Sequence, residues 1–296
     1  MTENSRNLSF TIITPSYNQG RYLSSAIHSL RWQTGCNIQY SVLDGGSTDD
    51  SVDILRANED FLFYWRSGPD DGPYAAVNEG LQSGTGDILG WLNSDDMYFP
   101  GALRFVHDVF AARPEVMWLT TRTLGNLNAY GDWSTIRIPG ASSTGIARGH
   151  HIPGANRRFH GFIQQESTFF RRSLIDAAKE KYGFFGLDLS LNLAADFDLW
   201  LRFSQIAELY TTNNLIAAFR WHGANRSGHI DQYIKQAWVS LDRYGSVPKN
   251  TTLHHIAAKT LPGRVRLKLG IDSTYVCNTV KRGPGGTIET GRHVYF

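Results

Sequence analysis

The chain of 296 residues is 41% hydrophobic and 19% charged, which is typical of a globular protein with a sizeable core. Its net charge of +2 argues against a protein that binds polyanions over its whole surface. Two cysteines, Cys36 and Cys277, are too few for a disulfide framework or a thiol metal site, and no run of about 18 apolar residues predicts a membrane span.

The first hundred residues alternate apolar, strand-like runs with amphipathic, helix-like runs. The strand-like runs are 8–14, 40–43, 61–65 and 87–92. The helix-like runs are 21–33, 52–58, 75–82 and 101–112. Such alternation predicts parallel strands joined by right-handed crossovers, so the expected fold class is α/β. Ligands of these sheets bind beyond the carboxyl ends of the strands.

A polar loop follows each of these four strands, at 14–17, 44–47, 69–72 and 93–96. In the last loop, Asp95 and Asp96 come directly after an apolar run, where two like charges repel each other. A polar turn is one explanation. The other is a divalent cation, because carboxylate oxygens are the ligands that Mg²⁺ and Mn²⁺ prefer. The chain lacks a glycine-rich phosphate loop, so a bound diphosphate would need such a cation.

The second half of the chain is less regular. Strand-like runs lie at 116–121, 133–138, 162–170 and 215–222, and helix-like runs at 171–181, 196–207 and 230–244. The polar, glycine-rich stretch 141–161 predicts a long loop outside the core, of the kind that is functional or mobile. Of the eight tryptophans, Trp133 and Trp221 are the pair expected to be exposed, since most of the others lie inside apolar runs.

Positive charge is concentrated after residue 246, where eight Lys or Arg residues accompany two acids. This basic end predicts contact with phosphates or with an anionic membrane surface, and a merely solvated end is the alternative. The first ten residues lack the long apolar stretch of a signal peptide. The expected location is therefore the cytoplasm, at the inner face of the membrane.

Four stretches together resemble the successive motifs of glycosyltransferase family 2. They are TPSYNQGRYLSSAIHSL, VLDGGSTDDSVDIL, GDILGWLNSDDMYFPGAL and ADFDLWLRF, and they occur in the family's order. The resemblance implies the GT-A fold, a Rossmann-like and mostly parallel sheet flanked by helices. It places a nucleotide-binding half at 1–100, an acceptor half at 101–246 and a basic C-terminal extension at 247–296.

The resemblance also implies a donor site for a nucleotide-sugar. Asp44 matches the acid that binds the base, usually uracil, and a turn acid is its alternative role. Ala75 stands where relatives often carry an acid, which puts one donor contact in doubt. The remaining residues expected to contact the nucleotide-sugar are Thr14, Pro15, Tyr17, Asn78, Asn93 and Asp95.

The sequence NSDD matches the metal-binding D-x-D motif of the family, with Asn93 in place of the first acid. Asp95 is therefore the expected direct ligand of Mn²⁺ or Mg²⁺, and Asp96 is expected to support it through water or ribose contacts. His222 falls where related enzymes place a histidine near the metal or the diphosphate, and a structural histidine is the alternative.

Asp196 matches the general base of the family, and Asp198, two residues on, points elsewhere on a helix. The residues expected to bind the acceptor are Gln165, Glu166 and Trp200. A pair bonded to the backbone is the alternative role of Gln165 and Glu166.

The implied function is an inverting, metal-dependent transfer of a sugar from a nucleotide-sugar, with UDP as the expected nucleotide. The expected acceptor is a glycan or a lipid-linked saccharide in cell-surface polysaccharide synthesis, with no nucleic-acid partner. Two alternatives stay open. A nucleotidyltransferase normally has a glycine-rich basic loop directly after its first strand, whereas here the first cation after that strand is Arg21. A non-catalytic sugar-nucleotide binding module would have no need for both Asp95 and Asp196.

Overall fold

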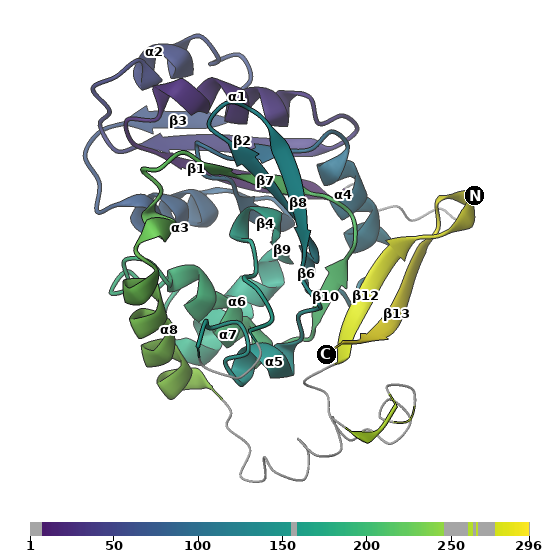
Figure 1. Cartoon of the computed structure of the whole chain (residues 1–296). Helices are drawn as coiled ribbons and strands as arrows, with labels where there is room; N and C mark the ends of the chain where they lie inside the picture. The colour runs from purple at the N-terminus through teal and green to yellow at the C-terminus, as the bar shows by residue number, and fades with distance from the viewer. Residues whose placement is uncertain (1–7, 155–158, 246–259, 263–264, 266–275, 296) are drawn as a thin grey trace.

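The protein is described here by a computed structural model that covers residues 8–154, 159–245, 260–262, 265 and 276–295. Within these residues one large sheet has the strand order β13-β12-β10-β6-β9-β4-β1-β2-β3 (Figure 1). Its strands are β1 (Ser9–Ser16), β2 (Asn37–Asp44), β3 (Tyr64–Ser67), β4 (Ile88–Trp91), β6 (Trp118–Thr121), β9 (Phe169–Arg171), β10 (Leu209–Thr212), β12 (Val276–Arg282) and β13 (Ile288–Val294).

The predicted alternation of strands and helices in the first hundred residues is confirmed. Strands β4, β1, β2 and β3 are parallel neighbours, so their carboxyl ends meet at one edge of the sheet. Pro73 at the first position of a helix removes an N–H that would have no partner there. The helices that join these strands are α1 (Gly20–Arg31), α2 (Ser51–Arg56), α3 (Pro73–Ser83) and α4 (Ala102–Ala112).

Apolar side chains cover both faces of the sheet in two layers. Helices α1 and α4 pack on one face through residues such as Ile27 and Leu103, which are fully buried. On the other face, α3 packs together with α6 (Arg172–Tyr182), α7 (Ala195–Ser204) and α8 (Ile230–Tyr244). Strand β9 runs antiparallel between β4 and β6, which the alternation pattern did not predict.

A second sheet has the order β5-β11-β7-β8 over the described residues. It consists of β5 (Met97–Tyr98), β7 (Thr123–Asn128), β8 (Trp133–Arg137) and β11 (Ala217–Trp221). Because β5 directly follows the 93–96 loop, this sheet ties that loop to the end of β11. The short helical segments are α5 (Ser143–Ala147), η1 (Gln165–Ser167), η2 (Arg226–Gly228) and η4 (Pro284–Gly286).

The stretch 141–161, expected outside the core, is largely buried where the structure describes it. Ile146 and Ile152 are fully buried, and His150, His151 and His160 are also buried. Nδ1 of His151 lies 2.7 Å from the carbonyl oxygen of Gly161, and burial lowers the pKa of His151 to about 4. A neutral imidazole that is hydrogen-bonded to the backbone can be buried at little cost. The polarity of 141–161 therefore did not predict its burial.

The end of the chain is part of the main sheet. The β12–β13 hairpin lies at the edge of the sheet, where β12 pairs in parallel with β10 (Figure 1). Arg282 binds Asp108 of α4 at 2.7 Å. The predicted extension therefore contributes strands from 276 onward, while most of the basic segment 260–270 lies outside the described residues. Among those described, no helix is long and apolar enough to cross a membrane.

Candidate active site

The loop after β4 meets the end of β11 at one corner of the molecule, called here the cation corner (Asp95 and His222). Nε2 of His222 lies 2.8 Å from Oδ2 of Asp95. The imidazole stacks on the ring of Tyr22 with centroids 4.9 Å apart, and the His222 side chain is only 5% exposed. Asn225 holds the turn after β11, because its side chain accepts from the backbone N–H of His222 and donates to the carbonyl of Arg220.

Asp96 lies inside the protein, which differs from the exposed position that a ligand role suggests. The backbone N–H of Arg220 donates to its Oδ1 at 2.9 Å, and Asn93 Nδ2 donates to its Oδ2 at 3.1 Å. Arg220 Nε also donates to the carbonyl of Asp95 at 2.7 Å. Burial, and then the charges of Asp95 and Glu166, raise the pKa of Asp96. Asp96 thus fixes the loop that presents Asp95.

The residues of the cation corner fit a divalent ion. The Asp95 oxygen and the His222 nitrogen point at each other, so a cation could take the place of the proton between them. Among the described residues, no group of three or more His, Cys, Asp or Glu side chains forms a closed metal cage. Mg²⁺ and similar ions are commonly held by one or two protein carboxylates together with substrate phosphates, which a two-ligand corner matches.

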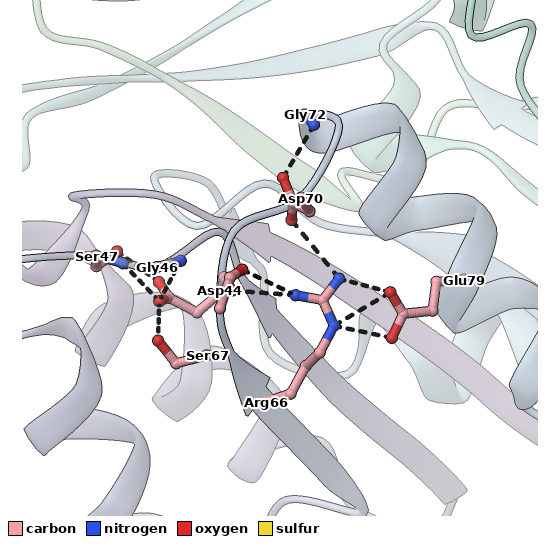
Figure 2. Close-up of polar contacts among 9 residues, drawn as sticks. Asp44, Gly46, Ser47, Arg66, Ser67, Asp70, Gly72 and Glu79 are labelled. Atoms are coloured by element: carbon pink, nitrogen blue, oxygen red, sulfur yellow. Dashed lines mark hydrogen bonds and ion pairs between the residues drawn. The ribbon is translucent and has the colours of Figure 1, made fainter.

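Asp44 is fully buried at the end of β2, where it orders the loop that follows (Figure 2). Its Oδ2 accepts from the N–H groups of Gly46 and Ser47 at 3.1 and 2.8 Å, and from Ser67 Oγ at 2.7 Å. Gly46 has φ of +84°, a conformation that favours glycine. Because protein donors surround this carboxylate, a contact with a nucleotide base stays a prediction.

Arg66 of β3 connects the loops of this edge, and no motif in the sequence predicted this role. Figure 2 shows its guanidinium between Glu79 and Asp70. The guanidinium also donates to the carbonyls of Asp44 and Gly68. Its Nε lies 2.9 Å from Glu79 Oε1, and Nη2 lies 3.6 Å from Asp70 Oδ2. The acids Asp70 and Asp71 are the sequence feature that could have indicated a half-buried cation here.

Of the first predicted loop, only Tyr17 is open to a ligand, with 62% of the residue exposed. Its ring lies beside Gly45, where an added Cβ would stand 3.4 Å from Tyr17 Cδ2 and 3.3 Å from Asp70 Oδ1. Thr14 and Pro15 are buried, and Thr14 Oγ1 accepts from Tyr40 Oη at 3.0 Å. Thr14 and Pro15 therefore support this edge of the sheet from inside the protein and are not exposed to a ligand.

Asn78, another predicted donor residue, uses its amide inside the protein. Its Oδ1 accepts from the N–H of Leu187 at 2.7 Å, and its Nδ2 donates to the carbonyl of Leu187 at 2.9 Å. The side chain thereby joins α3 to the segment before α7. A contact with the nucleotide-sugar would require one of these bonds to be shared or exchanged.

Asp196 lies in the first turn of α7 and is half-buried. Its Oδ1 accepts from the N–H of Phe197 at 2.8 Å. Burial raises the pKa of Asp196 to about 6, although hydrogen bonds and the charge of Arg226 oppose the shift. Asp198, in contrast, is fully buried in an ion pair with Arg202 at 2.8 Å, so the two acids point in different directions as expected.

Glu166 of η1 is 2% exposed, and its Oε1 has no hydrogen-bond partner within the described part of the chain. Burial, followed by the charges of Asp95 and Asp196, raises the pKa of Glu166 to about 8. The polar atoms of the neighbouring Gln165 amide are also buried without a partner in the same set of residues. Glu166 is therefore an acid covered by protein on which the charges of Asp95 and Asp196 both act.

The structure corrects the expectation that Trp200 binds the acceptor. Its ring is 1% exposed and stacks between Trp91 and Trp118 at centroid distances of 5.5 and 5.9 Å. Tryptophan on the apolar face of a helix packs into the core unless its face is open to the cleft. The expectation for Trp133 and Trp221 is confirmed, since they are 62% and 51% exposed.

Comparison with known proteins agrees with these motifs. The model of the family described as glycosyl transferase family 2 matches residues 11–176, which include the Asp44 loop, the cation corner loop and η1. The chain belongs to glycosyltransferase family 2. Over 213 residues it is 32% identical to an uncharacterized glycosyltransferase of Mycobacterium tuberculosis, covering 71% of this chain and 74% of that protein. An uncharacterized glycosyltransferase of Rickettsia conorii is 24% identical and is covered over 37% of its length.

Solved structures confirm the GT-A fold of this family 2 member. The mannosyltransferase PcManGT of Pyrobaculum calidifontis, in complex with GDP-Man and Mn²⁺, superposes with a TM-score of 0.57 at 16% identity, over 90% of this chain and 80% of that one. S. aureus TarS superposes with a TM-score of 0.55 at 14% identity, over 88% of this chain. The chain spans half of the length of TarS.

Proposed function

We propose that this glycosyltransferase moves a sugar, with inversion, from a nucleotide-sugar to a hydroxyl group of a saccharide acceptor. One observation supports this most. The charges of Asp95 in the cation corner and of Asp196 both act on the buried acid Glu166, so these three carboxyl groups lie close enough to interact. The proposed site of the leaving diphosphate and the proposed base would then be near each other, as a single displacement requires.

The donor occupies the edge of the sheet in this proposal. Tyr17 offers an exposed ring for the base, and the Asp44 and Asp70 loops form the wall beside it. The base is uracil by resemblance to the family, while the similar structures were solved with UDP-GlcNAc and with GDP-Man. Asp95 and His222 would hold Mn²⁺ or Mg²⁺. When bound, such an ion neutralises charge on the departing diphosphate.

Asp196 acts as the general base. As the acceptor oxygen attacks the anomeric carbon, its proton passes to the Asp196 carboxylate and the bond to the diphosphate breaks. A pKa of about 6 leaves the carboxylate ionised at neutral pH while keeping it a stronger base than an exposed aspartate. A neutral Glu166 and the Gln165 amide can bond the acceptor hydroxyls beside it.

The proposed setting is cell-surface polysaccharide synthesis at the cytoplasmic face of a membrane. Lys259, Arg264, Arg266 and Lys268, which would contact anionic lipid, lie outside the described residues. Because β12 and β13 belong to the sheet, the test replaces these four residues by Gln rather than removing 247–296. We expect less flotation with anionic vesicles for this variant, and equal flotation of the two proteins would contradict membrane contact.

Donor turnover and Asp196→Asn test the function. The purified protein with Mn²⁺ should hydrolyse or transfer from at least one nucleotide-sugar in a panel, which a non-catalytic binding module would not do. It should not form a nucleotide-sugar from a nucleoside triphosphate and a sugar phosphate, as a nucleotidyltransferase would. Asp196→Asn should bind the donor normally and lose about 10²- to 10⁴-fold in turnover. Asp176→Asn, on the exposed side of α6, is the matched control, and full activity of Asp196→Asn would refute the base assignment.

A further inference from the structure

The backbone that leads into α7, called here the α7 entry (192–194), has no capping side chain of its own. Ala194 is the residue before the helix, and its methyl group cannot accept a hydrogen bond from the first turn. Asp196 lies two residues further on, in that first turn. Whatever holds the α7 entry therefore also helps to fix the place of the Asp196 carboxylate.

Side chains from two other helices bond the α7 entry. Gln236 of α8 accepts with its Oε1 from the N–H groups of Leu193 and Ala194, at 2.8 and 3.2 Å. Tyr74, in the first turn of α3, donates its hydroxyl to the carbonyl of Leu193 at 2.7 Å. Burial, and then the charge of Asp196, raise the pKa of Tyr74, so the hydroxyl keeps the proton that it donates. Both backbone polar groups of Leu193 are thus bonded to side chains that are distant in the sequence.

Arg226 adds a third contact, from the turn after β11. Its guanidinium donates to the carbonyl of Asn192 and lies over the ring of Tyr74, with Cζ 5.1 Å from the ring centroid. The same turn carries His222 of the cation corner, whose N–H donates to Asn225. The three residues of the α7 entry are therefore held by α3, α8 and η2, which come together only in the folded chain.

The rest of α7 is held in a different way. Leu199, Trp200 and Phe203 are buried in the core, and they fix the helix through its apolar face. Loss of one hydrogen bond at the α7 entry therefore leaves the helix in place and loosens the turn that carries Asp196. This separates an effect on the proposed base from an effect on the fold.

We infer that Tyr74 and Gln236 are positioning residues for the proposed base, and that they affect turnover through Asp196. This inference rests on the proposed transferase function. Neither side chain needs to touch a substrate, because the Tyr74 hydroxyl and the Gln236 carbonyl oxygen are already bonded to the α7 entry. A general base must lie within hydrogen-bond reach of the proton that it accepts, and a displacement of about 1 Å can cost about 10²-fold in rate.

Two substitutions remove these bonds with little change of shape. Tyr74→Phe deletes one hydroxyl and keeps the ring under Arg226, and Gln236→Met deletes the acceptor at nearly the same length. Each is made in the wild type and in Asp196→Asn, because an effect that passes through the carboxylate disappears when the carboxylate is absent. The measurements are kcat and donor Kd with the nucleotide-sugar that wild type turns over fastest, in the presence of Mn²⁺.

The chain offers a matched control for each substitution. Tyr182 Oη lies 3.5 Å from the carbonyl of Arg202, near the other end of α7, so Tyr182→Phe makes the same chemical change away from the α7 entry. Gln232→Met makes the second change at an exposed position of α8. Thermal unfolding of all variants shows whether the fold is retained.

We expect Tyr74→Phe and Gln236→Met each to lower kcat about tenfold at unchanged donor Kd, since a partial displacement costs less than a full one of about 1 Å. In Asp196→Asn the same substitutions should change the residual turnover by less than about twofold. Both controls should match wild type.

Two results would overturn the inference. One is a kcat equal to that of wild type in both variants, and the other is a tenfold loss that persists in Asp196→Asn, which would mean a general effect on the fold. Failure of the proposed function would be seen separately, because wild type itself would then turn over no nucleotide-sugar, and the inference would fail with it.

Discussion

The donor side of the cleft (the loops after β1, β2 and β3) and the acceptor side (η1 and the start of α7) differ in how their buried polar groups are bonded. On the donor side, Asp44 accepts from three backbone or hydroxyl groups through one oxygen alone, and Arg66 is shared among two acids and two carbonyls. On the acceptor side, Glu166 and Gln165 keep polar atoms without a partner among the described residues.

This difference indicates which half is built before the ligand arrives. A buried polar group without a partner costs free energy, so it persists where a ligand supplies the missing bond. In the proposed function, the bonds of Asp44 and Arg66 would organise most of the donor side before the nucleotide binds, although Ser16 Oγ at the end of β1 is buried without a partner among the described residues. The unsatisfied groups of the acceptor side would be available to the second substrate. Substitutions should therefore affect stability on the donor side and recognition on the acceptor side.

The largest effect is expected at the cation corner, which both sides share. Asp95→Ala removes the carboxylate that would hold the ion, so donor affinity in the presence of Mn²⁺ should fall by at least about a hundredfold. Calorimetric titration with a nucleotide-sugar, with and without Mn²⁺, measures this. Asp176→Ala on α6 serves as the control. Unchanged donor affinity in Asp95→Ala would show that no metal acts at this corner.

The next effect concerns folding of the donor side. Asp44→Ala leaves the N–H groups of Gly46 and Ser47 and the Ser67 hydroxyl without their acceptor, so the free energy of unfolding should fall by about 3 kcal/mol. Urea unfolding followed by fluorescence measures the change. Asp53→Ala is the control, because its ion pair with Arg56 lies at the surface and is worth about 1 kcal/mol or less. Equal losses in both variants would remove the distinction between the two sides.

The pH dependence of turnover tests the acceptor side. Because Asp196 must be ionised to act as a base and its pKa is raised to about 6, turnover should rise about tenfold per pH unit below that value and level off above it. The residual turnover of Asp196→Asn should lack this step. A wild-type profile that is flat between pH 5 and pH 7 would contradict the assignment.

The smallest expected effect is the change of stability with pH, and its sign should be opposite on the donor and acceptor sides. The pKa of Glu166 is raised from 4.5 to about 8, so the stability that its protonated form provides is complete below pH 4.5 and lost as the pH rises through 8. Glu166→Gln cannot ionise, so its stability relative to wild type should rise as the pH increases from 4 to 9.

The matched donor-side variant is Glu79→Gln. The hydrogen bond from Arg66 lowers the pKa of Glu79, so its contribution to stability is present above pH 4.5 and lost in acid. Glu79→Gln should therefore be destabilised at neutral pH. Thermal unfolding across pH 4 to 9 compares the two variants. The same sign of change in both would show that the halves do not differ as described.

Local chemistry determined much of this protein from the sequence. The spacing of apolar residues predicted β1, β2 and β4 with their helices, and α8 at 230–244, because burial of one face repeats with the period of each element. The family was also readable, since its motifs consist of residues close together in the chain, while the roles of the acids after β4 and of Asp196 stay predictions.

Tertiary structure decided what depends on contacts between distant segments. The antiparallel β9, the addition of β12–β13 to the sheet and the burial of 141–161 follow from pairing and packing that no local period reveals. Asp95 and His222, 127 residues apart, meet only because β11 ends beside the loop after β4. Trp200 and Trp221 are chemically identical side chains, and only their place in the fold puts one in the core and the other at the surface.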